Sequence, residues 1–180
     1  MSRSTLDTVT TELARCWTGL DTATVHRARD LMRTLTRAPA GEPWLAQILE
    51  AQPESVELYR DPEHGFLLLA HVEQRGSYRS PHDHGSGWVV YAVQSGVTRM
   101  GSYRAFDGPD HAPRLVSRGA RDLLAGDCEV YLPGDIHDTE CRSDTLVQFR
   151  LTSCDFALEK AQGRMTVFPE PRERASIPAG

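Results

Sequence analysis

The sequence predicts a mainly β protein, in which a sandwich or barrel of antiparallel strands follows three helices. Up to about residue 52, apolar residues recur at steps of three and four, which is typical of amphipathic helices. After Pro53 the pattern changes to short β-rich segments separated by Gly, Pro, Asp and Ser, and these continue to about residue 156. A chain of 180 residues suits a single domain with a real hydrophobic core.

The first part of the chain contains the predicted helices. Two of them run from Leu6 to Trp17 and from Thr22 to Leu35, joined at residues 19–21. A third, about Pro43 to Ala51, begins with proline in its first turn, where the missing N–H is tolerated. Each helix has one apolar face that needs a partner. We therefore expect the helices to pack on the outside of the strands instead of forming a separate domain.

The sequence pattern predicts one domain over residues 1–180. It consists of a helical segment at 1–52, a β-barrel at 55–156 and a C-terminal extension at 157–180. Residues 107–113 form a turn-rich excursion, and the tail beyond Pro169 carries charge and proline without a hydrophobic period. That tail is expected either to wrap onto a neighbour or to be disordered.

Composition limits the partners of this chain. A net charge of −5 gives no electrostatic reason to expect nucleic acid or an anionic membrane. No apolar run approaches the roughly 18 residues of a membrane span, and the polar N-terminus lacks the hydrophobic region of a signal peptide. The four cysteines show no C-x-x-C spacing, so free thiols are expected. We predict a cytoplasmic protein, monomer or homodimer, with no nucleic-acid or membrane partner.

Two histidines two positions apart are the strongest functional signal. His82 and His84 lie in a segment with strand character, where alternate side chains share a face. A third histidine, His137, follows a proline-glycine turn that leads into another short strand. Neutral imidazole is a common transition-metal ligand, so these residues predict a metal site with open coordination positions. The other histidines lack such a frame and are expected to be ordinary polar residues: His26, His64, His71 and His111.

The spacing around these histidines resembles the two signature motifs of the cupin superfamily. In the first motif one glycine precedes the H-x-H pair and another follows it, as Gly76 and Gly96 do here. The second motif is matched by Gly134 to His137, with Pro133 one position from the usual proline. The resemblance covers roughly residues 55–156. It implies a cupin double-stranded β-helix, which is a jelly-roll barrel, with the N-terminal helices packed outside.

One position departs from the usual cupin pattern. The glutamate that is commonly a fourth ligand is replaced by Val89. A cupin with three histidines and no glutamate resembles the thiol dioxygenase branch, the cysteine dioxygenase-like proteins, whose ferrous site oxidises a thiol to a sulfinic acid. The resemblance implies an oxidoreductase with Fe(II) as cofactor and a small-molecule thiol and O2 as substrates. The ligand set alone would also accept zinc, nickel, copper or manganese.

The last predicted strand, Thr145 to Thr152, departs most from that branch. Thiol dioxygenases commonly carry serine, histidine and tyrosine at alternate positions there, and the matching residues here are Gln148, Arg150 and Thr152. Arg150 would then point into the pocket, where its two-pronged guanidinium suits a carboxylate. An edge-strand position with Arg150 at the surface is the alternative, because a shift of one residue exchanges the two faces. The altered residues favour a thiol other than free cysteine.

Other residues are candidates for substrate binding. Arg60 falls near the position of a substrate-binding arginine in cysteine dioxygenase-like proteins. Strand parity predicts that Tyr78 shares the face of the paired histidines, and that Tyr91 shares the face of Val89, which would form a dry wall beside the metal. Trp88 is a candidate for stacking on substrate, with packing in the sheet as the alternative. The predicted substrate-binding set is Arg150, Arg60, Gln148, Tyr78, Val89, Tyr91 and Trp88, with no catalytic residue beyond the metal ligands.

Two other functions stay open. One is a cupin metalloenzyme with different chemistry, either a dioxygenase that cleaves a carbon–carbon bond or an isomerase. The other is a non-catalytic cupin that binds a small ligand, because a fold does not fix a function. Retention of all three histidines argues against an inert binder.

Overall fold

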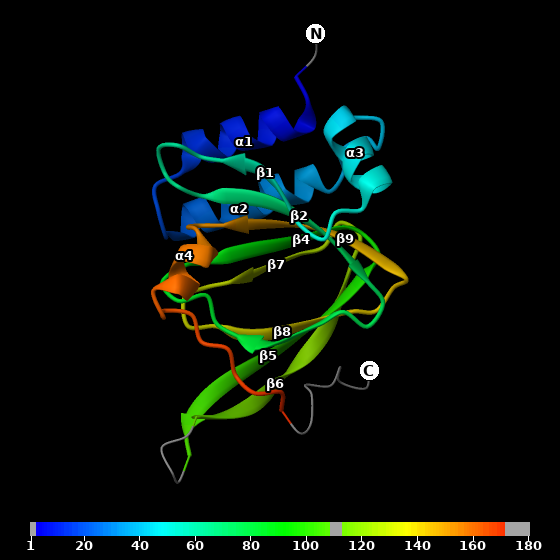
Figure 1. Ribbon diagram of the computed structural model, residues 1–180. Coiled ribbons are helices and arrows are strands. Elements are labelled where there is room, and N and C mark those ends of the chain that lie inside the picture. The colour runs from blue at the N-terminus through cyan, green and yellow to red at the C-terminus, as the bar shows by residue number, and fades with distance from the viewer. Residues whose placement is uncertain (1–2, 109–112, 172–180) are drawn as a thin grey trace.

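The computed structural model describes residues 3–108 and 113–171 (Figure 1). His111 lies outside the described residues, as do parts of the predicted turn and of the C-terminal tail. The helices before the strands are α1 (Thr5–Cys16), α2 (Thr22–Leu35) and α3 (Pro43–Ala51), and α4 (Phe156–Ala161) follows them. The strands are β1 (Val56–Arg60), β2 (Leu67–Gln74), β3 (Tyr78–His82), β4 (Val89–Ser95), β5 (Val97–Asp107), β6 (Pro113–Leu124), β7 (Cys128–Tyr131), β8 (Ile136–Cys141) and β9 (Thr145–Thr152).

The predicted helices are confirmed to within a residue at their ends, and local capping explains where they begin. Ser4 and Asp21 each accept a hydrogen bond from a backbone N–H in the first turn of the helix that follows. Pro43 occupies the first turn of α3. Among the described residues, no helix has the length and apolar character needed to cross a bilayer.

The strand pairing is nested. Strand β2 pairs with β9, β3 with β8, β4 with β7 and β5 with β6, all antiparallel. This is the pattern of one long hairpin rolled up on itself, which is the jelly roll or double-stranded β-helix. Cross-pairing completes two sheets with the orders β1-β2-β9-β4-β7 and β3-β8-β5-β6. The predicted fold class, a mainly β double-stranded β-helix, is confirmed.

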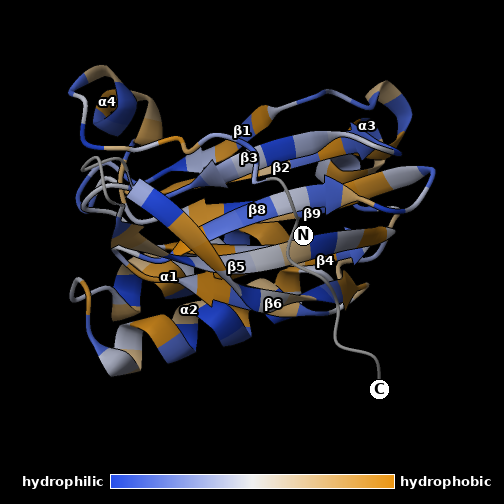
Figure 2. Cartoon of the chain, turned by 90° about the horizontal axis from the view of Figure 1, so that it is seen from below, coloured by the Kyte–Doolittle hydropathy of each residue, from blue (hydrophilic) through white to orange (hydrophobic). Residues whose placement is uncertain are grey.

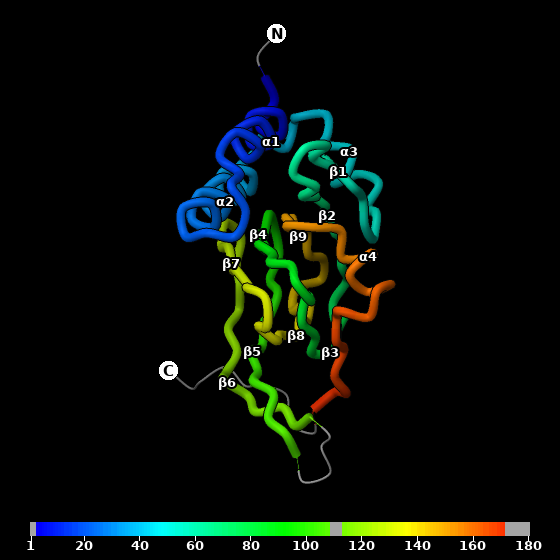
Figure 3. The backbone as a smooth tube through the Cα atoms, turned by 90° about the vertical axis from the view of Figure 1, so that its left-hand side faces the viewer, coloured from blue at the N-terminus to red at the C-terminus, as the bar shows by residue number. Residues whose placement is uncertain are grey.

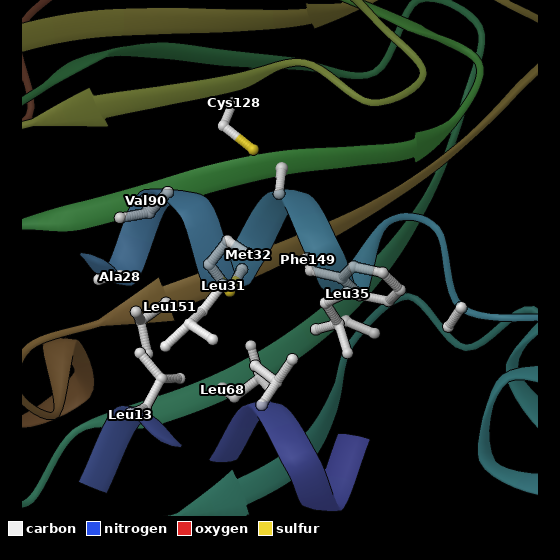
Figure 4. Packing of buried hydrophobic residues seen from close by; sticks show 14 of the residues in the cluster. Leu13, Ala28, Leu31, Met32, Leu35, Leu68, Val90, Cys128, Phe149 and Leu151 are labelled. Carbon is white, nitrogen blue, oxygen red and sulfur yellow. The ribbon is translucent and has the colours of Figure 1, made fainter. Parts of the chain in front are cut away.

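The molecule is layered, with the five-stranded sheet between the helices and the four-stranded sheet (Figure 3). Helices α1 to α3 cover the outer face of the five-stranded sheet, as expected from their apolar faces. Figure 4 shows Leu13 and Met32 from the helices meeting Leu68 and Phe149 from the sheet. Burial of these large side chains contributes on the order of 1.5–3 kcal/mol each. The helices and the barrel therefore share one core.

The outer face of the four-stranded sheet holds a buried carboxylate. Hydrophilic and hydrophobic residues are interspersed along the strands on this side (Figure 2). Asp138 is fully buried and accepts hydrogen bonds from the Tyr103 hydroxyl at 2.6 Å, the Gly101 N–H at 2.9 Å, the Tyr78 hydroxyl at 3.0 Å and Arg99 at 3.3 Å. Because side chains alternate along a strand, this anchorage turns the neighbouring His137 toward the barrel interior.

Candidate metal centre

The structure brings the three motif histidines together. His82 ends β3, His84 lies in the loop that follows, and His137 lies in β8 directly opposite His82 in the strand register. One potential ligand atom from each residue lies within 4.8 Å of the others, which makes a group able to hold a metal ion. The antiparallel pairing of β3 with β8 thus closes a site that is spread over more than 50 positions of sequence.

The nitrogen positions fit a metal ion. The Nε2 atoms of His84 and His137 lie 3.2 Å apart. Two nitrogens about 2.1 Å from one ion, with an angle of about 90–110° between them, are about 3.0–3.4 Å apart. The Nδ1 atom of His82 is 2.8 Å from the Ser80 carbonyl oxygen, so a proton on Nδ1 leaves Nε2 free as a ligand.

Burial keeps these imidazoles neutral. Burial lowers the pKa of His82, lowers that of His84 to about 3 and holds that of His137 well below its ordinary value. The positive charge of Arg150 lowers all three pKa values further. Neutral imidazole is the form that binds a metal, so the site is ready for an ion at neutral pH without losing protons.

Aromatic rings enclose two of the histidines, and the sequence analysis missed two of these rings, Tyr131 and Phe156. The ring of Tyr131 stacks on His137 with 3.9 Å between centroids, and Phe156 stacks on His84 at 4.9 Å. Tyr91 packs edge-on against His137. Only the pairing of β4 with β7, which sets Tyr131 opposite Val89, would have pointed to Tyr131. The rings hold the imidazoles in place and restrict water around them.

Strand β9 turns Gln148, Arg150 and Thr152 toward the space between the sheets. Their neighbours Val147, Phe149 and Leu151 belong instead to the core beneath the helices. Arg150 is directly opposite Tyr91 of β4 in the strand register. The Nε atom of Arg150 is buried without a partner. An arginine is therefore present in the interior beside the histidines, and its role in binding a substrate stays a prediction.

Two other predicted substrate residues lie away from the histidines. The side chain of Arg60 is 48% exposed and forms ion pairs with Glu57 at 2.8 Å and Asp155 at 3.0 Å. Trp88 points the opposite way from its neighbour Val89 and stacks on Trp17 beneath the helices, with 5.1 Å between centroids. Neither side chain is positioned to reach a ligand on the three histidines.

Tyr78 requires a correction to the parity argument. The register of β3 against β8 shifts by one residue between Arg79 and His82, so the alternation of faces is broken there. Tyr78 consequently lies on the outer side, where its hydroxyl bonds Asp138, and Arg79 takes the inner side opposite Thr139.

Val89 is fully buried on the interior face. This position is the one required if Val89 forms a dry wall beside the metal.

The fold and this cluster together define a double-stranded β-helix protein with a three-histidine site able to hold a metal ion. No protein-family model and no curated protein matches the chain. Solved structures are similar to it. The capsular polysaccharide assembling protein CapF from Staphylococcus aureus matches 67% of this chain at 17% identity and a TM-score of 0.48.

Two further solved structures are similar at comparable levels. KdgF from Halomonas sp. matches 58% of this chain and 81% of its own, at 17% identity and a TM-score of 0.44. The cupin domain of Cnp3 from Schizosaccharomyces pombe matches 61% of this chain and 66% of its own, at 7% identity and a TM-score of 0.44. This chain spans 31% of the length of CapF. The fold assignment rests on the nested strand pairing described above.

Proposed function

We propose that this protein is a non-haem iron-dependent thiol dioxygenase of the cupin superfamily. The reaction adds both atoms of O2 to the sulfur of a small thiol and gives its sulfinic acid. The observation that carries the proposal is the convergence of three neutral imidazoles, two of them fully buried, with an arginine whose Nε atom is buried. The proposal includes a single domain over residues 1–180 and a cytoplasmic location, which remain predictions.

The three histidines would hold a ferrous ion through ring nitrogens. When bound, such an ion supplies adjacent open positions at which the sulfur of the substrate and dioxygen meet. Val89 stands where a carboxylate ligand is usual, which leaves the site without a negative charge from the protein. The chain then contributes three neutral ligands, and a thiolate and an anionic substrate are electrostatically favoured.

Arg150 is the residue proposed to anchor the far end of the substrate. Its guanidinium lies close enough to the cluster to lower the pKa of every ligand histidine. Tyr91 lies directly opposite Arg150 in the strand register. A carboxylate on the substrate would neutralise the charge of Arg150 and satisfy its buried, unpartnered Nε atom. Val89, Tyr131 and Phe156 exclude water, which strengthens this pairing.

Oxygen uptake tests the activity. The protein loaded with Fe(II) is mixed with cysteine, 3-mercaptopropionate, mercaptosuccinate or cysteamine, and the sulfinate product is measured by mass spectrometry. Uptake with at least one carboxylate-bearing thiol is expected. No uptake with any thiol, alongside turnover of a catechol or a diketone, would favour the rival metalloenzyme. Binding of thiols without any turnover would favour the non-catalytic binder.

The carboxylate anchor is tested by a matched pair of substitutions. Arg150→Leu should weaken the binding of carboxylate thiols by about 2–5 kcal/mol, which corresponds to a rise in KM of at least about thirtyfold. The metal content should not change. Arg60→Leu should behave as wild type, because Arg60 is exposed and already paired with two carboxylates. Cysteamine has no carboxylate, so its KM should not respond. Equal effects of both substitutions would remove Arg150 as the anchor.

A further inference from the structure

A second group of polar side chains is buried between the sheets, separate from the three histidines. We name it the distal polar cluster, and its members are His71 (6% exposed), Glu73 (4%), Thr139 (2%) and Gln148 (2%). Each member has at least one buried polar atom without a hydrogen-bond partner. For His71 this holds for both ring nitrogens, although the backbone of Glu54 lies near the ring.

The register places the members of this cluster side by side. His71 of β2 is directly opposite Gln148 of β9, and Glu73 follows His71 on the same face of its strand. Thr139 of β8 is opposite Arg79, whose guanidinium donates to Glu73 at 3.1 Å. The cluster therefore spans the space between both sheets and is continuous through the Arg79–Glu73 ion pair.

Buried polar atoms without partners are expensive, and native proteins satisfy nearly all of them. Each of these four side chains carries a desolvation penalty that no hydrogen bond offsets, so together they destabilise the free protein. Apolar residues of similar size would fill the same space without that loss. The arrangement is the one expected when the partner is a ligand that binds there and completes the hydrogen bonds.

The cluster has Arg150 near one side and an open cleft on the other. The charge of Arg150 acts on the three ligand histidines and on His71, so Arg150 is close to both groups. On the other side, Glu73 and Arg79 line an open cleft of about 450 Å³, together with Glu54 and Tyr78. The side chain of Arg79 is 46% exposed and that of Glu73 only 3% exposed, so this pair reaches from the cleft into the interior.

The atoms that lack partners define the chemistry of the ligand. The Gln148 Oε1 and Glu73 Oε2 atoms are acceptors, and a neutral His71 and Thr139 offer both acceptor and donor capacity. Burial lowers the pKa of His71 to about 3, and the charges of Arg150 and Arg79 contribute to this shift. Burial, which is the largest cause of this shift, also disfavours a charged ammonium group, so a neutral donor fits best.

We propose that the distal polar cluster is a substrate subsite that binds an uncharged hydrogen-bond donor, a hydroxyl or an amide N–H, on a thiol that also carries a carboxylate. This inference rests on the proposed function, because the thiol would be bound at the three histidines and the carboxylate at Arg150. It narrows the substrate class to thiols with a third polar group.

Binding is tested with four thiols that share a three-carbon skeleton and differ only at C2. These are 3-mercaptopropionate, 3-mercaptolactate, N-acetylcysteine and cysteine, titrated anaerobically into the Fe(II)-loaded protein and followed by calorimetry. The hydroxyl and acetamido thiols should bind about tenfold more tightly than 3-mercaptopropionate, and the ammonium of cysteine should give no such gain. In Gln148→Met and His71→Phe this advantage should disappear. Equal affinity for all four thiols in the wild type would overturn the inference.

The anaerobic measurement separates this inference from the proposed function. If the predicted ranking is found but no thiol is oxidised when oxygen is admitted, the subsite stands and the dioxygenase proposal fails. If a thiol is oxidised but the ranking is flat, the dioxygenase stands and the subsite fails.

Thermal stability without ligand gives an independent readout. Groups retained for a ligand destabilise the free protein, so Gln148→Met and His71→Phe should each raise Tm by about 2–4 °C. Thr24 supplies the matched control, because it is equally buried but its hydroxyl bonds Asp21 at 2.8 Å. Thr24→Val should lower Tm. If the two cluster variants also lower Tm, the cluster has a structural role and the inference is wrong.

Discussion

Tyr131 lies flat against the ring of His137, with 3.9 Å between centroids and 16° between planes. The two residues come from different sheets, because β7 belongs to the five-stranded sheet and β8 to the four-stranded one. The contact therefore fixes one potential metal ligand against the opposite wall of the barrel. Ring stacking restricts the rotation of the imidazole.

This contact predicts the effect of two substitutions at one position. Tyr131→Ala should weaken metal binding about tenfold, because the His137 ring gains freedom that it must lose again on binding. Tyr131→Phe keeps the ring and should bind metal nearly as well as the wild type. Competition with a chelator measures both affinities. A loss in the phenylalanine variant equal to that in the alanine variant would show that the hydroxyl, and not the stacking, is responsible.

The histidine cluster predicts metal content directly. His137→Ala should remove most of the bound metal, since it deletes one of three nitrogens and leaves a fully buried position empty. His26→Ala is the control, because His26 is exposed on α2 and lies outside the cluster. Elemental analysis after loading with Fe(II) and desalting gives the metal content of both variants. Full metal content in His137→Ala would refute the assignment.

The buried His71 predicts a dependence of stability on pH. Burial, Arg150 and Arg79 lower its folded pKa from 6.5 to about 3. Below pH 6.5 the unfolded chain therefore binds a proton at His71, whereas the folded protein binds it only near pH 3. Between pH 6.5 and about pH 3 the free energy of unfolding consequently decreases as the pH is lowered, by on the order of 1 kcal/mol per pH unit.

Urea unfolding of the wild type and of His71→Phe, at several pH values between neutrality and about pH 4.5, isolates this contribution. The variant has no titrating group at that position. The difference between its free energy of unfolding and that of the wild type should therefore increase in favour of the variant as the pH is lowered. The contributions of the other titrating groups cancel in the difference. Parallel curves for the two proteins would mean that His71 titrates at its ordinary pKa when folded.

The buried ion pair on the outer face predicts a large loss of stability. Asp138→Asn leaves the buried guanidinium of Arg99 without its counter-charge and should cost about 3–5 kcal/mol in free energy of unfolding. Asp144→Asn is the matched control: Asp144 also pairs with an arginine, Arg75, but its side chain is 93% exposed. That change should cost less than about 1 kcal/mol. Chemical denaturation measures both values, and similar losses would contradict the assigned role of burial.

Much of the fold could be predicted from the sequence because it depends on local pattern. The helices were located by apolar residues at steps of three and four. Capping by Ser4 and Asp21, which the structure shows, also acts within a few residues. The inner and outer faces of β9 were predicted by the same means, since Phe149 and Arg150 simply alternate. The metal ligands were predicted from the spacing of His82 and His84 and from a family resemblance.

The sequence by itself thus determined the elements, the order of the faces along most strands and the identity of the three histidines. Tertiary structure alone decided what depends on pairing between distant strands. The bulge in β3 places Arg79 on the interior side instead of Tyr78, and strand pairing places Tyr131 against His137 and His71 beside Gln148. A bulge changes parity without altering composition, and contacts between sheets join residues far apart in sequence, so no local pattern encodes either of them.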